Sequence, residues 1–247
     1  MNDTASVGII GGADGPTAIY LTGNQDLGLA GNWILGGDSG GSAGQFAGFL
    51  VVLAAMVLLA YFIGNISPST LLAKSRGLDI KKEGSGNAGT TNALRVMGKK
   101  AGAITLVVDI LKGVVSVLLG ELICGSGCAM LCVVAVMLGH IWPVIYRFKG
   151  GKGVATAFGA LMGLNPLLGL SALGVVIIGV LISKRMSVGS MLGALSFPVI
   201  CYFLEPDFIY MGCVLAILIL VKHRANIMRL FKGEEPKLSI FDKEKKE

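Results

Sequence analysis

The sequence predicts an all-helical membrane protein that crosses the bilayer several times. Of its 247 residues, 53% are hydrophobic and 15% are charged, whereas a soluble domain carries about 25% charged residues. The mean hydropathy is +0.75. The 37 glycines agree with this class, because glycine is commoner in membrane helices than in soluble ones. Lipid is the solvent that suits so much apolar surface.

The distribution of charge predicts the orientation. Every Lys and Arg lies at Lys74 or later, and the preceding residues contain only acidic charges. Cytoplasmic loops collect Lys and Arg, and translocated segments lack them. We therefore expect the N-terminus outside and the basic loops and C-terminus in the cytoplasm. The acidic residues of the first segment are Asp3, Asp14, Asp26 and Asp38.

Composition divides the chain into three parts. Residues 1–45 are Gly-rich, acidic and aperiodic, and we expect an extracytoplasmic leader. A signal peptide is not expected, because no basic region and no apolar run precede Gln45. Residues 46–235 are predicted to form the membrane domain, and residues 236–247 a charged cytoplasmic tail.

The membrane domain contains a series of apolar runs. A span needs about 20 residues, so the run at 153–163 is too short and is expected to be a tilted or re-entrant helix that ends at Asn165-Pro166. Counting seven passes, or five passes with 153–183 as a hairpin dipping into the membrane, gives the same sidedness. The runs are 46–66, 101–122, 128–147, 153–163, 166–183, 188–204 and 207–224.

The cysteines are predicted to be packing residues. Cys124, Cys128 and Cys132 are spaced by four and share one helix face. A metal or redox site is not favoured, because no CxxC or Cys/His ligand spacing is present. Cys201 and Cys213 are interpreted in the same way.

A Gly-rich polar segment follows the first span on the cytoplasmic side. It reads GSGNAGTTN from Gly84 to Asn92, and Arg95 comes soon after. Glycines allow backbone N–H groups to line a concave anion site, and a guanidinium matches a phosphate in bidentate fashion. A loop without a ligand is the alternative. The candidate phosphate-binding residues here are Ser85, Gly86, Asn87, Thr90, Asn92 and Arg95.

A second candidate segment, KGGKGVAT, covers Lys149–Thr156. It is not a P-loop, because the GxxxxGK[ST] spacing is absent. Glycines flank Lys152 on both sides, and a helix is expected to start just after it, which favours an anion site built from Gly151, Lys152 and Gly153. An ordinary positive-inside turn is the alternative.

The third segment closes the last span. His223 and Asn226 are three residues apart and share a helix face. A solvated basic collar is the alternative, but a histidine and an asparagine add nothing to a collar. Because all three segments lie on one side of the membrane, they indicate a phosphorylated cytosolic substrate that meets a membrane-dissolved one.

Other polar residues lie within or beside the spans. Asp109 and Lys112 are predicted to form a structural ion pair inside 101–122. His140 is predicted to be an interfacial anchor. Ser187 and Ser190 follow a basic turn on the cytoplasmic side.

The three polar segments resemble the three motifs of the bacterial acyl-phosphate:glycerol-3-phosphate acyltransferase family, the membrane-bound PlsY type. The similarity extends from about Phe49 to Glu235 and includes Gly64–Pro68, Asp109–Gly113 and Gly139–Pro143. It implies seven transmembrane helices, some short, an outside N-terminus and a cytoplasmic active site in a bacterial cell membrane.

The resemblance also implies a reaction. The 1-hydroxyl of glycerol 3-phosphate attacks a fatty acyl phosphate, and lysophosphatidic acid and inorganic phosphate leave, at the start of phospholipid synthesis. Arg95 and Lys152 are expected to bind phosphate, with Ser85 and Ser190 as further donors. His223 and Asn226 are expected to orient the hydroxyls, and the residues expected to act in catalysis are Ser85, Lys152, His223 and Asn226.

The general base stays open between His223 and the substrate's own phosphate. The His-x4-Asp signature of other glycerolipid acyltransferases is absent, because Ile145 and Met228 occupy the carboxylate positions. We expect no metal or coenzyme and no nucleic acid. The expected partners are the two substrates, membrane lipid and a soluble enzyme that makes acyl phosphate.

The N-terminus departs from the family. Val7–Ile19 resembles a short motif of sodium-pumping decarboxylase β subunits, in which Asp14 lies among glycines. A leader or recombined fragment is expected rather than a sodium pathway. A small transporter for a phosphorylated metabolite or ion is the alternative function, but it would place polar groups near the midplane and show internal repeats, and we see no repeat. A third alternative is a membrane scaffold that is not an enzyme.

Overall fold

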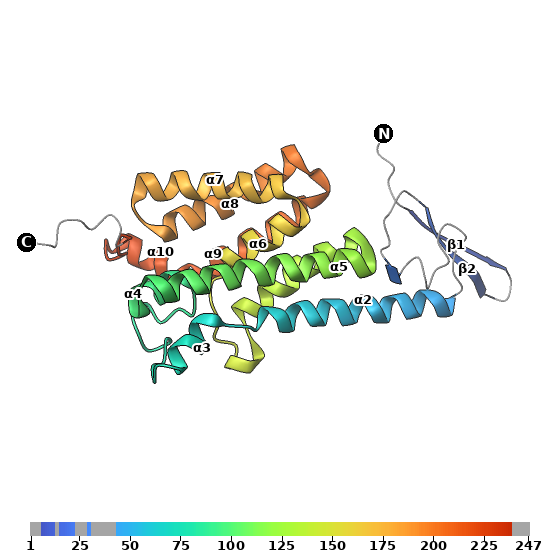
Figure 1. The fold of residues 1–247 in the computed structure, drawn as a ribbon. Coiled ribbons are helices and arrows are strands. Elements are labelled where there is room, and N and C mark those ends of the chain that lie inside the picture. The colour runs from blue at the N-terminus through green and yellow to red at the C-terminus, as the bar shows by residue number, and fades with distance from the viewer. Residues whose placement is uncertain (1–5, 13–14, 23–28, 31–42, 239–247) are drawn as a thin grey trace, which may run out of the picture.

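The computed structural model describes residues 6–12, 15–22, 29–30 and 43–238. The four leader aspartates, Asp14 among them, and the tail from residue 239 lie outside the described residues. From residue 43 onward the described chain is helical, with the long helices arranged side by side (Figure 1).

The leader departs from the aperiodic, all-helical expectation. Strands β1 (Ser6–Gly12) and β2 (Gly15–Thr22) form an antiparallel hairpin in which Ile9 lies opposite Ile19. The physical reason is local, because β-branched and aromatic residues favour strands and are frequent in both segments.

Several helices are long enough for the bilayer. Helix α2 (Ala43–Gly64) has 22 residues and is about 33 Å long, which exceeds a hydrocarbon core of about 30 Å. Within the described residues, α2, α5, α7 and α8 are long and apolar enough to span, and α9 with α10 makes a fifth if that pair, bent by 57°, is one span. Large apolar side chains such as Ile182, 79% exposed, face outward. The chain is therefore a multi-pass membrane protein.

Helix α5 (Lys99–Ile141) contains two of the predicted apolar runs. Its 43 residues are interrupted at Gly125, where φ is 77°. In a straight helix Asp109 and His140 would lie about 46 Å apart, but Asp109 Oδ1 lies 3.4 Å from His140 Nδ1. The helix therefore reverses at Gly125, a conformation that glycine adopts without steric cost, and its two halves run antiparallel (Figure 1).

The next helices follow the predicted boundaries closely. Helix α6 (Val154–Leu164) has 11 residues and is about 16 Å long, too short to span. Asn165 ends it and caps α7 (Pro166–Ser183), because its Oδ1 accepts a hydrogen bond from Leu167 N at 3.0 Å. Helix α8 (Met186–Leu204) and the short η3 (Pro206–Phe208) lead to α9 (Ile209–Lys222) and α10 (Arg224–Phe231).

One helix ends at the start of the polar stretch 73–100 and another lies within it, and the composition predicted neither. Helix α3 (Pro68–Lys74) begins at a proline, and α4 (Thr90–Met97) buries Ala93 and Met97 in a small cluster of their own. A further short turn, η2 (Val144–Tyr146), follows α5. Four alanines, Ile80 and Met97 are the buried residues of this cluster, so its apolar signal is weak beside the surrounding charges.

Two apolar cores hold the body together. The larger one joins α5, α6, α8 and α9 through residues such as Val133, Ala157, Phe197 and Leu215. The smaller one packs the second half of α5 against α2, and it contains Cys124, Cys128 and Cys132. The packing role predicted for these cysteines is confirmed, and Cys201 is also buried, but Cys213 is exposed and the prediction is wrong there.

Candidate active site

One cavity of about 1040 Å³ opens among the ends of the helices where α4, the start of α6 and α10 meet. Its polar part comes from three segments that are remote in sequence. Ten of the twelve predicted site residues line it, while Gly86 and Gly151 are not among the lining residues. The ten are Ser85, Asn87, Thr90, Asn92, Arg95, Lys152, Gly153, Ser190, His223 and Asn226.

The first segment is shaped by one buried amide. Asn92, 1% exposed, accepts from Ser85 N at 2.9 Å through Oδ1 and donates to Glu83 O at 3.0 Å through Nδ2. A second donation reaches Ile80 O at 3.3 Å. The Asn92 amide thus holds the loop in shape. Arg95, on the following α4, is exposed and lines the cavity.

The second segment runs along the end of α5. Gly150 N donates to Ile141 O at 3.2 Å and Gly151 N donates to His140 O at 3.1 Å. Gly153, with φ of 84°, then turns the chain into α6. This path places Lys152 in the cavity, where Nζ donates to Asn226 Oδ1 at 2.5 Å.

The third segment is the bend between α9 and α10. His223, 1% exposed, lies at the bend, and its Nδ1 is 2.8 Å from Ile219 O. A carbonyl oxygen can only accept, so Nδ1 carries the proton and the neutral ring has its lone pair on Nε2. His223 therefore offers an acceptor nitrogen at the cavity wall.

Sequence reasoning missed a carboxylate in this site. Glu235, 7% exposed, accepts from Ser187 Oγ and Asn226 Nδ2 at 2.6 Å each through Oε1. Arg229 Nε donates to its Oε2 at 2.8 Å, and Arg185 Nε donates to its backbone oxygen at 2.9 Å. This carboxylate joins α8 and α10 to the chain that follows them. Two acidic residues in an otherwise basic segment were the available signal.

Charged side chains of both signs line the cavity. The pKa of Lys152 is lowered to about 8, mainly by burial; Glu235 opposes this shift, and the nearby Arg229 and Arg95 add to it. Burial alone would raise the pKa of Glu235, but the hydrogen bonds from Ser187, Asn226 and Arg229 outweigh it and leave the pKa below its usual value. An anion bound beside Lys152 would therefore be stabilised, because it would offset the repulsion between the Lys152 ammonium and the neighbouring arginines.

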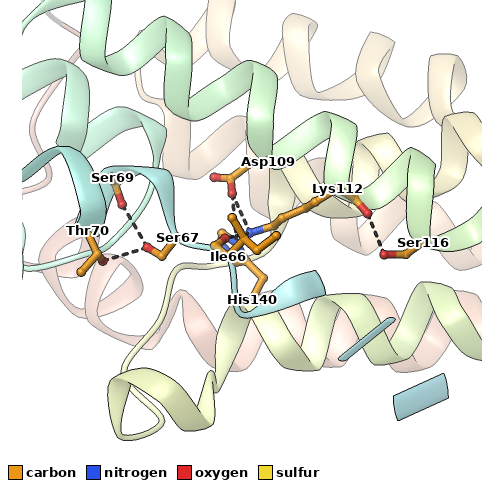
Figure 2. A network of polar contacts seen from close by, with 8 residues as sticks. All are labelled: Ile66, Ser67, Ser69, Thr70, Asp109, Lys112, Ser116 and His140. Carbon is orange, nitrogen blue, oxygen red and sulfur yellow. Dashed lines mark hydrogen bonds and ion pairs between the residues drawn. The ribbon is translucent and has the colours of Figure 1, made fainter. Parts of the chain in front are cut away.

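Beneath the second segment lies a buried polar cluster (Figure 2). The predicted ion pair is confirmed, with Lys112 Nζ 2.7 Å from Asp109 Oδ1. The prediction that His140 is an interfacial anchor is wrong, because the residue is 6% exposed and its Nδ1 lies 2.7 Å from Lys112 Nζ. The buried ammonium needs acceptors, and His140 supplies one of them.

Comparison with known proteins shows which family the chain belongs to. The sequence model described as glycerol-3-phosphate acyltransferase matches residues 54–233. The chain belongs to this family. The match ends two residues before Glu235, so the carboxylate lies just beyond it.

Two relatives within the family align with this chain over almost their whole length. The glycerol-3-phosphate acyltransferase of Thermoanaerobacter pseudethanolicus is 42% identical over 184 residues, which is 73% of this chain and 93% of the relative. That of Finegoldia magna is 44% identical over 195 residues, covering 77% and 96%.

Solved structures of the family share the fold. The crystal structure of PlsY, an integral membrane glycerol 3-phosphate acyltransferase, in its glycerol 3-phosphate form is 32% identical, with a TM-score of 0.73. It covers 77% of this chain and 100% of the PlsY chain. A form of PlsY with lysophosphatidic acid matches at 33% identity and a TM-score of 0.70, covering 75% of this chain and 95% of that one.

The Glu235 network predicts a stability effect. Glu235→Gln should destabilise the protein by about 2 kcal/mol, because three donors lose a charged acceptor. The pKa of Glu235 is lowered, so its contribution is present at neutral pH and is lost as pH falls through that lowered pKa. Thermal unfolding in detergent measures the effect. Glu234→Gln, at the exposed neighbouring residue, is the control. Equal melting temperatures for the two variants at pH 7 would contradict it.

Proposed function

We propose that the protein transfers a fatty acyl group from an acyl phosphate to the 1-hydroxyl of glycerol 3-phosphate. One observation carries the proposal: a single cavity collects polar groups from three remote segments and continues between apolar helices. A phosphorylated substrate fits the polar part, and an acyl chain fits the apolar part. The apolar lining includes Leu106, Ile110, Phe158, Leu161, Leu173, Val176, Phe197 and Leu215.

The cations receive the phosphate groups in this proposal. Lys152 and Arg95 approach the cavity from separate segments, so together they can hold the phosphates of both substrates. Ser190 and the first segment add short donors, namely Ser85, Gly86, Asn87 and Thr90. Gly151 and Gly153 shape the loop that carries Lys152. Asn92 acts by folding the first segment, since its amide is engaged there.

The reaction needs little activation of the nucleophile. The glycerol oxygen attacks the acyl carbonyl, a C–O bond forms, and the bond from the carbonyl carbon to the phosphate oxygen breaks. Inorganic phosphate leaves with its electron pair, and the hydroxyl proton is transferred to a base. Because an acyl phosphate has a good leaving group, positioning and charge stabilisation supply most of the acceleration.

Two groups can act as that base. The acceptor nitrogen of His223 can take the hydroxyl proton, and the substrate's own phosphate can take it as well. Asn226 helps to orient the hydroxyls, although its Oδ1 accepts from Lys152 and its Nδ2 donates to Glu235. Its hydrogen bonds therefore place Lys152 relative to Glu235.

The membrane arrangement follows from the same proposal. Seven helices cross or enter the bilayer: α2, both halves of α5, α6, α7, α8 and α9. The N-terminus and the leader to residue 45 lie outside, and the cavity and the tail from residue 236 lie in the cytoplasm, where Lys and Arg gather. A soluble enzyme that produces acyl phosphate is the partner this orientation allows. Asp109 and Lys112, which motivated the transporter alternative, neutralise each other as an ion pair and so do not support an ion pathway.

The activity itself gives the first test. Purified protein should release inorganic phosphate from palmitoyl phosphate only when glycerol 3-phosphate is present, and palmitoyl-CoA should not replace the donor. Lys152→Ala and Arg95→Ala should lower kcat/KM about 100-fold or more, because charge stabilisation is lost. Phosphate release and lysophosphatidic acid formation are measured together.

Exposed cations outside the cavity provide matched controls. Lys149→Ala for Lys152 and Lys100→Ala for Arg95 should retain wild-type turnover. Full turnover of both site variants would overturn the phosphate assignment, and efficient use of palmitoyl-CoA would overturn the donor assignment.

The lowered pKa of Lys152 predicts a pH dependence. Below about pH 8 the amine is charged and binds phosphate, and above it the charge is lost. Because kcat/KM reports the free enzyme, its value for glycerol 3-phosphate should fall as pH rises through about 8. In Lys152→Arg the falling limb should move to much higher pH, because a guanidinium stays charged. A limb that does not move would assign the titration to another group.

Orientation has a direct test in whole cells. In a Cys213→Ser background, Asn24→Cys should react with a membrane-impermeant maleimide and Lys82→Cys should react only after the cells are permeabilised. The reverse pattern would place the cavity outside.

A further inference from the structure

The buried cluster of Asp109, Lys112 and His140 holds together three parts of the chain. Asp109 and Lys112 belong to the first half of α5, His140 ends the second half, and Ile66 lies between α2 and α3. Figure 2 shows the Lys112 side chain reaching across to His140 and Ile66. Asp109 and His140 also line the cavity.

The Lys112 ammonium has three acceptor atoms within hydrogen-bond distance. It has three N–H donors, and Nζ lies 2.7 Å from Asp109 Oδ1, 2.8 Å from Ile66 O and 2.7 Å from His140 Nδ1. Its side chain is 3% exposed, so these partners replace water completely. Because the ammonium can only donate, His140 Nδ1 accepts, and the proton of the neutral ring lies on Nε2. His140 and His223 therefore carry their protons on different nitrogens.

His140 is in contact with the loop that carries Lys152. Its carbonyl accepts from Gly151 N at 3.1 Å, and the next carbonyl, of Ile141, accepts from Gly150 N at 3.2 Å. Gly151 passes so close to the His140 ring that a Cβ there would collide with Nε2. The same Cβ would lie 3.0 Å from the carbonyl oxygen of Ala88, in the first polar segment. The loop is thus confined between the imidazole and that carbonyl.

We propose that Asp109, Lys112 and His140 are positioning residues that hold the Gly150–Lys152 backbone in place for phosphate binding. The inference rests on the proposed function and adds residues that act through the loop. Asp109 balances the ammonium, the ammonium fixes the orientation and tautomer of His140, and the ring fixes Gly151. Lys152 follows Gly151 directly, so a shift of the ring displaces the ammonium that meets the phosphate.

A purely structural ion pair makes a different prediction. Removing one buried partner is strongly destabilising, whereas replacing both with apolar residues is often neutral. If the pair only stabilises the fold, Asp109→Leu combined with Lys112→Met should restore both stability and catalysis relative to Lys112→Met alone. If the cluster positions the loop, the double variant should regain thermal stability but keep a KM for glycerol 3-phosphate raised about tenfold or more.

Two further variants complete this experiment. His140→Asn retains an acceptor for Lys112 but removes the ring beneath Gly151, so it should raise KM in the same way with kcat less affected. Ser116→Ala is the control, because Ser116 is equally buried on the same helix and only donates to Lys112 O at 2.7 Å within that helix. Wild-type KM in either the double variant or His140→Asn would overturn the proposal.

The wild-type protein offers a test that needs no stable variant. The chain contains two histidines, so ¹⁵N-histidine NMR of the protein in detergent shows two imidazoles. We expect one ring protonated on Nε2 and one on Nδ1, and glycerol 3-phosphate should shift the resonances of both. Two Nδ1-protonated rings, or an Nε2-protonated ring that does not respond to glycerol 3-phosphate, would overturn the proposal. Absence of turnover in the wild type would instead overturn the proposed function and leave the tautomer assignment intact.

Discussion

A charge that leaves water must find its partners inside the protein, and this constraint determines where the molecule keeps its cations. Lys112 is inside the helical body and has three acceptors within hydrogen-bond distance. Lys152 is at the end of the helices and has one neutral acceptor, Asn226. The Lys112 ammonium has no hydrogen-bonding capacity left for a ligand, whereas the Lys152 ammonium can still bind an anion.

Two carboxylates, of Asp109 and Glu235, lie close to these cations and offset their charge. Asp109 compensates the buried ammonium beneath the second polar segment, whereas Glu235 accepts hydrogen bonds from groups around Lys152 without contacting Lys152 in an ion pair of its own. Glu235 thereby orders Asn226, and Asn226 orders Lys152. The cavity keeps a net excess of positive groups, while the side chains that shape it are fixed by hydrogen bonds.

The apolar runs predicted most of the helical body because their length and hydrophobicity are strong signals. Six runs became α2, the two halves of α5, α7, α8 and α9, and the short run became α6, with Asn165 capping the helix that follows it. The short helices α3 and α4 were missed because small alanine side chains make up most of their packing. The leader hairpin was missed because glycines obscure its alternating β-branched residues.

Sequence reasoning selected residues that line one cavity where residue type and position were both unusual, as for Lys152 between glycines and for His223 with Asn226 three residues later. Sequence reasoning could not show what a side chain contacts. His140 has the position of an interfacial anchor, and only the reversal of α5 brings it against Lys112. Asn92 has the composition of a ligand-binding residue, but its amide closes its own loop.

The position of Glu235 has a practical consequence for anyone who shortens the protein. A truncation chosen at the last residue of the family match would retain every helix and all three polar segments. It would remove the acceptor shared by Ser187, Asn226 and Arg229 and leave an uncompensated group of cations at the mouth of the cavity. Such a fragment would still match the family model in full but would lack the carboxylate that orders the side chains of the cavity.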